Sequence, residues 1–184
     1  MRPTTTAPIT AWDTEVVTEF ATTANDDILV LARDPRVSLG PAVEAARVHE
    51  YLVPVDRDNV AFEVRAGLGE LRINSFELAN DLIDLVNSFL DQFGLQQARL
   101  RVEVTRSQSC PKFHCDNVHV RLVTTYVGPT TEYQYAGESA THVAPLFGLV
   151  FLKGHRHPNH QDRVHHRSPE VPLGEKRLCV AIDF

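Results

Sequence analysis

The chain has 184 residues, of which 43% are hydrophobic and 23% charged, and this is ordinary for one soluble globular domain with its own core. A formal net charge of −6 does not suit a nucleic-acid binder, and no apolar run approaches the ~20 residues that cross a bilayer. The absence of a signal-peptide pattern, together with only three cysteines, predicts a cytoplasmic protein with reduced thiols and no nucleic-acid or membrane partner.

The N-terminal third predicts a lead-in followed by short elements. Residues 1–27 are expected to be a flexible segment, because their opening stretch is rich in Thr and Pro and lacks periodicity. Residues 28–32 form an apolar run that predicts a buried strand. A helix is expected after it, with Ser38 as its cap and Pro41 in its first turn, and residues 60–64 fit another short strand.

The strongest local pattern covers residues 75–93, where apolar residues recur at three- and four-residue steps and predict an amphipathic helix. Asn74 with Glu77 fits a capping box, and Gly94 suits a left-handed residue at the end of the helix. After Gly94 the apolar period changes from 3.6 to two, which is typical of strands. The strands expected in this half are 99–106, 114–125, 146–152 and 177–184.

Helices that precede strands predict an α+β fold with one domain over residues 28–184. Within it, residues 38–93 are expected to form a helical support. Residues 98–184 are expected to form a core of antiparallel strands, arranged as a sandwich or barrel.

The histidines point to a functional site, because five of the nine lie between positions 155 and 166. On a strand, His114 and Asp116 would point to one face, with Cys115 on the other. A third ligand from His165 or His166 would complete a 2-His-1-carboxylate metal site, as in non-haem Fe(II) oxygenases. A surface strand with two solvated polar groups is the alternative.

Arg177 begins the last predicted strand and shares a face with the small residues Cys179 and Ala181. If that face points inward, the arginine needs an anion, and a guanidinium grips a carboxylate with two parallel hydrogen bonds. The alternatives are that Arg177 is exposed or that Lys176 takes its place. A Cys-His nucleophile built on Cys110 or Cys115 is the weaker interpretation of the same region.

Four segments carry a resemblance to a known family: Cys110-Pro111-Lys112-Phe113-His114-x-Asp116, Arg121-Leu122, Thr125-Tyr126-x-Gly128-Pro129 and His166-Arg167-Ser168-Pro169. They resemble the bacterial domain of unknown function 1826 over about residues 28–184. More distantly, the order of these motifs and Gly174-x-x-Arg177 resembles the double-stranded β-helix of Fe(II)/2-oxoglutarate dioxygenases, the prolyl-hydroxylase type especially. This resemblance implies a jelly-roll, cupin-like barrel.

The dioxygenase resemblance implies roles for five residues. His114, Asp116 and His166 would hold Fe(II), Arg177 would bind the far carboxylate of 2-oxoglutarate, and Tyr126 would lie near this cosubstrate. The expected function is therefore a 2-oxoglutarate-dependent oxygenase. The alternative is a non-catalytic, cupin-like zinc-binding protein in metal homeostasis, because the same ligands accept Zn²⁺ and residues 155–160 offer further histidines. A third reading is an interaction domain with a degenerate barrel.

Overall fold

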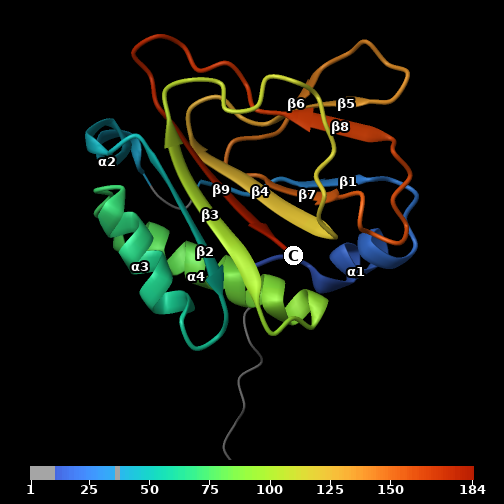
Figure 1. Cartoon of the computed structure of the whole chain (residues 1–184), viewed down its shortest axis with the longest axis horizontal. Helices are drawn as coiled ribbons and strands as arrows, with labels where there is room; N and C mark the ends of the chain where they lie inside the picture. Colours follow the sequence, from blue (N-terminus) through green and yellow to red (C-terminus); the bar gives the residue numbers. More distant parts are fainter. Residues whose placement is uncertain (1–10, 36–37) are drawn as a thin grey trace, which may run out of the picture.

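The computed structural model describes residues 11–35 and 38–184, and Figure 1 shows two sheets there, with helices below the larger sheet and the smaller sheet above it. The large sheet has the strand order β1 (Ile28–Leu31), β7 (Leu149–Lys153), β4 (Val120–Val127), β9 (Arg177–Asp183), β3 (Ala98–Thr105), β2 (His49–Val55). The small sheet has the order β6 (His142–Val143), β5 (Glu132–Tyr135), β8 (Val164–Arg167). Every pair of neighbouring strands is antiparallel.

The helices are α1 (Thr14–Thr22), α2 (Gly40–Ala45), α3 (Val60–Glu70) and α4 (Phe76–Phe93). The structure confirms the amphipathic helix predicted over residues 75–93 and the left-handed Gly94 that ends it, with φ of 62°. Its cap differs from the prediction by one residue, because the Ser75 hydroxyl, rather than Asn74, accepts a hydrogen bond from the Leu78 amide at 3.2 Å. The apolar face of α4 packs with alternate residues of β3, β4 and β9 in the main core.

Three predictions for the N-terminal third are wrong. Residues 60–64 begin helix α3 and not a strand, because Val60, Val64 and Leu68 recur at helical spacing and are buried together against α4. Ser38 does not cap α2, whose N-cap is Leu39 and makes no side-chain hydrogen bond. The region predicted as a flexible lead-in contains helix α1, which buries Val17 and Phe20 in the main core. Residues 1–10 of that lead-in lie outside the described residues.

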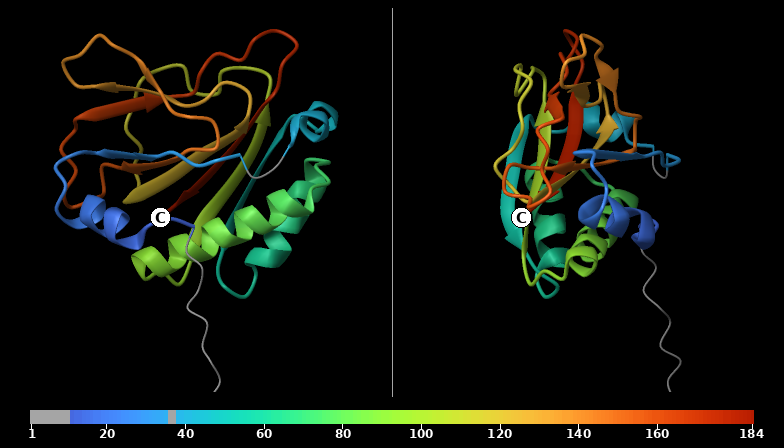
Figure 2. Two further views of the ribbon diagram at one scale, coloured as in Figure 1. Left: turned by 180° about the vertical axis from the view of Figure 1, so that it is seen from behind. Right: turned by 90° about the vertical axis from the view of Figure 1, so that its right-hand side faces the viewer.

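The N-terminal part also supplies strands. The structure confirms the strand predicted over residues 28–32, which is β1, whereas β2 lies within the residues predicted as a helical support. Strand β1 pairs with β7 and strand β2 pairs with β3, so they form the two edges of the large sheet, as Figure 2 shows from behind. Residues 38–93 are therefore not a purely helical support. The fold is a mixed α/β fold with two antiparallel sheets.

From β3 onward, the chain passes back and forth between the two sheets. After β3, His114 bridges to β8 of the small sheet, β4 returns to the large sheet, β5 and β6 are in the small sheet, and β7, β8 and β9 alternate again. The inner face of the large sheet carries small apolar residues such as Val123, Cys179 and Ala181, which form a second cluster with Val164 of β8. Because these residues are small, the two sheets leave room between them for polar groups.

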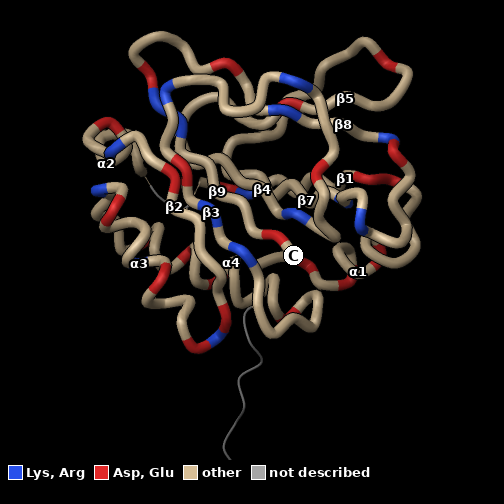
Figure 3. The backbone as a smooth tube through the Cα atoms, viewed as in Figure 1, with Lys and Arg blue, Asp and Glu red and all other residues tan. Residues whose placement is uncertain are grey.

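Acidic and basic residues are mixed along the sheets and loops in the view of Figure 3. Within residues 11–35 and 38–184, no helix combines the length and apolarity that crossing a bilayer requires.

Candidate functional site

His114, Asp116 and His166 meet between the two sheets. The His166 Nε2 atom lies 3.1 Å from Asp116 Oδ2, and the His114 Nε2 atom lies 3.4 Å from Asp116 Oδ1. The two imidazole rings are 4.6 Å apart between centroids, and one ligand atom from each of the three residues lies within 4.8 Å of the others. Two imidazoles and one carboxylate with this spacing are able to share one metal ion.

Backbone pairing brings the two histidines together. The amide of His114 donates to the carbonyl of His166 at 3.0 Å, and the amide of His166 donates back at 2.9 Å, so the two residues form an isolated antiparallel bridge. His166 lies on β8, with its side chain turned toward this site. His165, its neighbour, points elsewhere and lies 3.2 Å from Asp162 Oδ1. The structure thus places His166, and not His165, beside His114 and Asp116.

The strand expected over residues 114–125 begins only at Val120, so Asp116 lies in the loop between the His114 bridge and β4. The alternation of a continuous strand is therefore not what brings His114 and Asp116 together. Instead, an amide from the loop after β7 fixes this turn, because the His155 amide donates to the Asp116 carbonyl at 2.9 Å. Gly154 permits this approach, since a Cβ at that position would lie 2.7 Å from the Asp116 carbonyl oxygen.

The protonation of the three groups suits a cation. His114 Nδ1 lies 2.9 Å from the carbonyl of Lys112, which only accepts, so a proton on Nδ1 would leave the Nε2 lone pair for a cation held beside Asp116. Burial lowers the pKa of His166 and keeps the imidazole neutral. Burial opposes the ionisation of Asp116, but the adjacent His166 imidazole and the charge of Arg121 hold the pKa of this carboxyl well below its ordinary value.

One carboxylate oxygen at this site lacks a well-aligned donor. In the described part of the chain, no group makes a hydrogen bond of good geometry to the buried Oδ2 of Asp116, although Arg121 Nη1 lies 2.7 Å from it as an ion pair. The two imidazole nitrogens and the carboxylate face one another, and this arrangement fits a divalent cation at their centre.

Arg121 belongs to a chain of charges that the sequence analysis missed. Its guanidinium bridges Asp116 and Asp183, with its Nη2 atom 2.6 Å from Asp183 Oδ2. The other oxygen of Asp183 pairs with Arg99 at 2.7 Å. Arg121 and Asp183 are direct cross-strand partners on β4 and β9, and this long-range register is not readable from either segment alone. Arg121 therefore orients the carboxylate of Asp116 within the cluster.

Arg177 points into the same cavity, and its residue is 2% exposed. Its Nε donates to the Pro129 carbonyl at 2.9 Å, and its Nη2 lies 3.3 Å from both the Thr125 and Thr131 hydroxyls. All three acceptors are neutral, and none of the described carboxylates lies within ion-pair distance of Arg177. The Lys176 ammonium instead donates to the carbonyls of Glu44 and Ala46 outside the cavity.

The cavity shared by these groups has a volume of about 510 Å³. Its polar wall carries the histidines, Asp116, Arg121 and Arg177, and its apolar wall consists of small residues. The remaining residues that line it are Glu50, Arg101, Glu103, Ser109, Cys110, Val123, Thr131, Arg167, Ser168, Cys179 and Ala181. Its size and its mixture of cation and apolar surface suit a small carboxylate-bearing ligand.

The predicted role of Tyr126 near a cosubstrate is wrong. Along β4 the side chains of Arg121, Val123 and Thr125 face the cavity, so Tyr126 faces the helices and is buried in the main core. Its hydroxyl donates to Asp81 Oδ2 on α4 at 2.6 Å. Tyr126 therefore joins the sheet to the helix layer.

Cys115 turns away from the histidine–aspartate cluster, as the sequence predicted, and does not suit a nucleophile. Burial, together with the charge of Asp116, raises the pKa of its thiol to about 11, so the thiolate is scarce near neutral pH.

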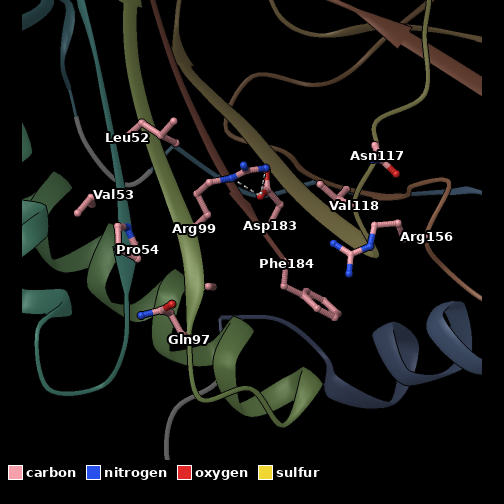
Figure 4. Close-up of a pocket in the computed structure, with 11 residues that line it drawn as sticks. Leu52, Val53, Pro54, Gln97, Arg99, Asn117, Val118, Arg156, Asp183 and Phe184 are labelled. Carbon is pink, nitrogen blue, oxygen red and sulfur yellow. Dashed lines mark hydrogen bonds and ion pairs between the residues drawn. The ribbon is translucent and has the colours of Figure 1, made fainter.

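A second cavity, of about 570 Å³, opens at the other end of the large sheet (Figure 4). Figure 4 shows the Arg99–Asp183 ion pair on its wall, with Arg156 and Phe184 nearby. Its lining residues include neither histidine nor cysteine, so we assign the chemistry to the cavity that contains His114 and His166.

The chain is similar in structure to several solved proteins. A Pseudomonas putida prolyl-4-hydroxylase is 12% identical, and the likeness covers 93% of this chain and 97% of that one, with a TM-score of 0.46. A viral collagen prolyl hydroxylase from Paramecium Bursaria Chlorella virus-1 is 10% identical, over 72% of this chain and 94% of that one, with a TM-score of 0.41. A C-terminally truncated protein from Neurospora crassa, in its apo form, is 16% identical, over 69% of this chain but only 46% of that one, with a TM-score of 0.39.

No curated protein sequence matches the chain. A family match covers residues 42–183, which is most of the chain, and the family is described as a protein of unknown function, DUF1826. The family resemblance carried by the segments around His114, Arg121 and His166 is thereby confirmed. The chain belongs to the DUF1826 family.

Proposed function

We propose that this protein is a non-haem Fe(II), 2-oxoglutarate-dependent oxygenase of the hydroxylase type. One observation carries the proposal: a 2-His-1-carboxylate cluster lines the same cavity as a buried arginine that pairs with none of the described carboxylates. The first feature suits a metal with open coordination positions, and the second suits the carboxylate of an organic acid.

His114, Asp116 and His166 would hold the iron. All three line the same cavity, and three protein ligands would leave coordination positions of the metal for other ligands. When bound, Fe(II) with 2-oxoglutarate supplies oxidative chemistry, in which O₂ converts 2-oxoglutarate to succinate and CO₂ and its second oxygen atom goes to the substrate. His114 is oriented for this role by the Lys112 carbonyl, and Asp116 by Arg121.

Arg177 would bind the far carboxylate of 2-oxoglutarate. Its guanidinium is already fixed by the Pro129 carbonyl and the hydroxyls of Thr125 and Thr131, so little rotational freedom is lost when an anion binds. Gly128 makes this arrangement possible, because its φ is 84° and a Cβ there would lie 2.7 Å from the Lys176 carbonyl oxygen. The turn that carries Pro129 thus packs directly against the start of β9.

The winding of β3 through β9 supports the proposal. Strands that pass alternately between two facing antiparallel sheets form a double-stranded β-helix, and we infer that this is the barrel here. In this arrangement the His114 bridge, β8 and β9 surround one opening.

The alternative function is a zinc-binding protein without catalysis, because the three ligands also accept Zn²⁺. Arg177 favours the oxygenase. A protein that only stores zinc has no anion to place against a buried arginine, and burying an unpaired cation costs free energy.

The test is succinate formation by the chelator-treated chain after anaerobic loading with Fe(II), addition of 2-oxoglutarate and exposure to oxygen. We expect succinate from the wild type and from Asp84→Ala, which removes an exposed carboxylate on α4. We expect none above background from Asp116→Ala. Equal succinate from Asp116→Ala and the wild type, or none from an iron-loaded wild type, would refute the proposal.

A further inference from the structure

A second group of side chains that could hold a metal ion lies near the first group. Cys115, His155 and His160 place one sulfur and two imidazole nitrogens within 4.8 Å of one another. Cys115 Sγ lies 3.9 Å from His160 Nε2, and the two imidazole rings are 5.0 Å apart between centroids. None of these residues belongs to the cluster of His114, Asp116 and His166, and none of them lines the cavity of that cluster.

His160 is oriented by a buried carboxylate. Asp27, whose side chain is 1% exposed, accepts hydrogen bonds from the amides of Gln161 and Arg163, and its Oδ1 lies 3.5 Å from His160 Nδ1. Within the described residues, this buried Nδ1 makes no aligned hydrogen bond. A metal on Nε2 would fix the proton on Nδ1, facing Asp27, as in the carboxylate–histidine–zinc arrangement of known sites.

Backbone contacts hold the other two residues in register. The His155 amide donates to the Asp116 carbonyl at 2.9 Å, and the Arg156 amide donates to the Val118 carbonyl at 3.1 Å. Gly154 allows the two loops to approach, because a Cβ there would lie 2.2 Å from the Val118 carbonyl oxygen. The loop with His155 and the loop with Cys115 are therefore joined before any metal binds.

The distances suit zinc. A tetrahedral ion about 2.3 Å from sulfur and about 2.0 Å from nitrogen separates those two ligand atoms by roughly 3.5 Å, so the observed 3.9 Å needs only a small closure. Asp162 Oδ1, 3.8 Å from His160 Nε2, or a water molecule is available as the fourth ligand. Thiolate is a soft ligand that selects Zn²⁺ over Fe(II).

We propose that Cys115, His155 and His160 form a second metal site, which binds Zn²⁺ and cross-links the loop after β7 to the loop that carries Asp116. In the tripeptide His114-Cys115-Asp116, the outer residues then serve one site and the middle residue serves the other. The sulfur-containing site takes zinc, and the nitrogen–oxygen site remains available to a harder cation.

The test uses Co²⁺ as a spectroscopic substitute for Zn²⁺ in the full chain, under reducing conditions. A sulfur-to-cobalt charge-transfer band arises only where a thiolate binds the ion. We expect this band, with two cobalt ions per chain, in the wild type, and its loss with one ion remaining in Cys115→Ser. His166→Ala should keep the band and lose the other ion, so failure of one site is distinguishable from failure of the other.

Cys110→Ser and Cys179→Ser are the matched controls, since both cysteines line the cavity of the first site. We expect them to keep the band, and a band lost in either control but kept in Cys115→Ser would overturn the proposal.

Zinc affinity gives a second readout that does not depend on sulfur. Removing a ligand should weaken Zn²⁺ binding well over tenfold, because loss of a mere supporting partner already costs about 10- to 100-fold. We therefore expect this loss when the exposed His155 is replaced by Ala in a chain that already carries His166→Ala. The affinity for Zn²⁺ is measured by competition with a chelator. His49→Ala is the matched control, because this exposed histidine on β2 pairs with Glu70 and not with any residue of the site, and it should bind within about twofold of that background. Equal affinity in all three would overturn the assignment.

Discussion

Arg177→Met replaces a buried cation with an apolar side chain of similar length. In the native protein the guanidinium makes hydrogen bonds only to neutral oxygens, those of Pro129, Thr125 and Thr131. Since no described carboxylate pairs with it, the substitution leaves no buried acid unpaired. None of the metal ligands lies on β9, since His166 is on β8 and His114 and Asp116 precede β4, so their affinity for Fe(II) or Mn²⁺ should stay within about threefold of the wild type.

The loss should appear in 2-oxoglutarate binding. Truncating one partner of a buried, hydrogen-bonded charge pair costs about 2–5 kcal/mol, which raises Kd by about 30- to 5,000-fold. In the wild type, 2-oxoglutarate at a hundred times its Kd should stabilise the fold by about 2.7 kcal/mol. For a chain of this size, that raises Tm by about 5–11 °C. In Arg177→Met the same concentration should change Tm by only a small part of this.

Calorimetric titration of 2-oxoglutarate into the Mn²⁺-loaded protein, with thermal unfolding in parallel, measures both effects. Arg167→Met is the matched control, because Arg167 lines the same cavity but already pairs with Glu132 at 2.6 Å. We expect the control to bind 2-oxoglutarate within a few-fold of the wild type. Unchanged binding in Arg177→Met, or an equal loss in Arg167→Met, would refute the role given to Arg177.

Four further substitutions test the site and the fold. His166→Ala should weaken metal binding well over tenfold, whereas His165→Ala should change it less than about twofold, as measured by metal content after dialysis against a weak chelator. Asp116→Asn, measured in the presence of a chelator, should lower the free energy of unfolding at neutral pH. This difference from the wild type should shrink as the pH falls below about 4, because the lowered pKa of Asp116 stabilises the fold only while the carboxyl is ionised. A deficit that does not change with pH would contradict this. Tyr126→Phe should cost about 1–3 kcal/mol in denaturant unfolding, through its lost bond to Asp81, and should leave 2-oxoglutarate binding unchanged.

Helices and strands whose apolar residues recur at one clear spacing were predictable from the sequence. Helix α4 buries one face, so its 3.6-residue spacing predicted both its type and its inward side. Strand β9 is buried on both faces, but the alternation of large apolar residues with small or charged ones predicted a strand and the side that faces the cavity. The short run at residues 60–64 fits either a strand or a helix, and only the burial of Leu68 one turn later identifies α3. Strand β2 was missed because it is an edge strand that contains Pro54 and begins with exposed polar residues.

The site was predictable where its functional residues lie close together in the sequence. The spacing of His114 and Asp116 was informative, although a bridge and a loop, rather than one strand, bring these two side chains together. The partnership of Arg121 with Asp183 depends on the register between β4 and β9, which neither segment encodes alone. Counting alternate residues from Arg121 along β4 would have placed Tyr126 on the helix side.

The central claim is that one cavity binds Fe(II) and 2-oxoglutarate together. Anaerobic titration of the Fe(II)-loaded protein with 2-oxoglutarate tests it most directly, because the ternary complex of such sites gives a weak visible charge-transfer band. We predict a band that saturates at one 2-oxoglutarate per iron and is absent in His166→Ala. An iron-loaded wild type that shows neither the band nor any heat of 2-oxoglutarate binding would contradict the claim and favour the zinc-binding alternative.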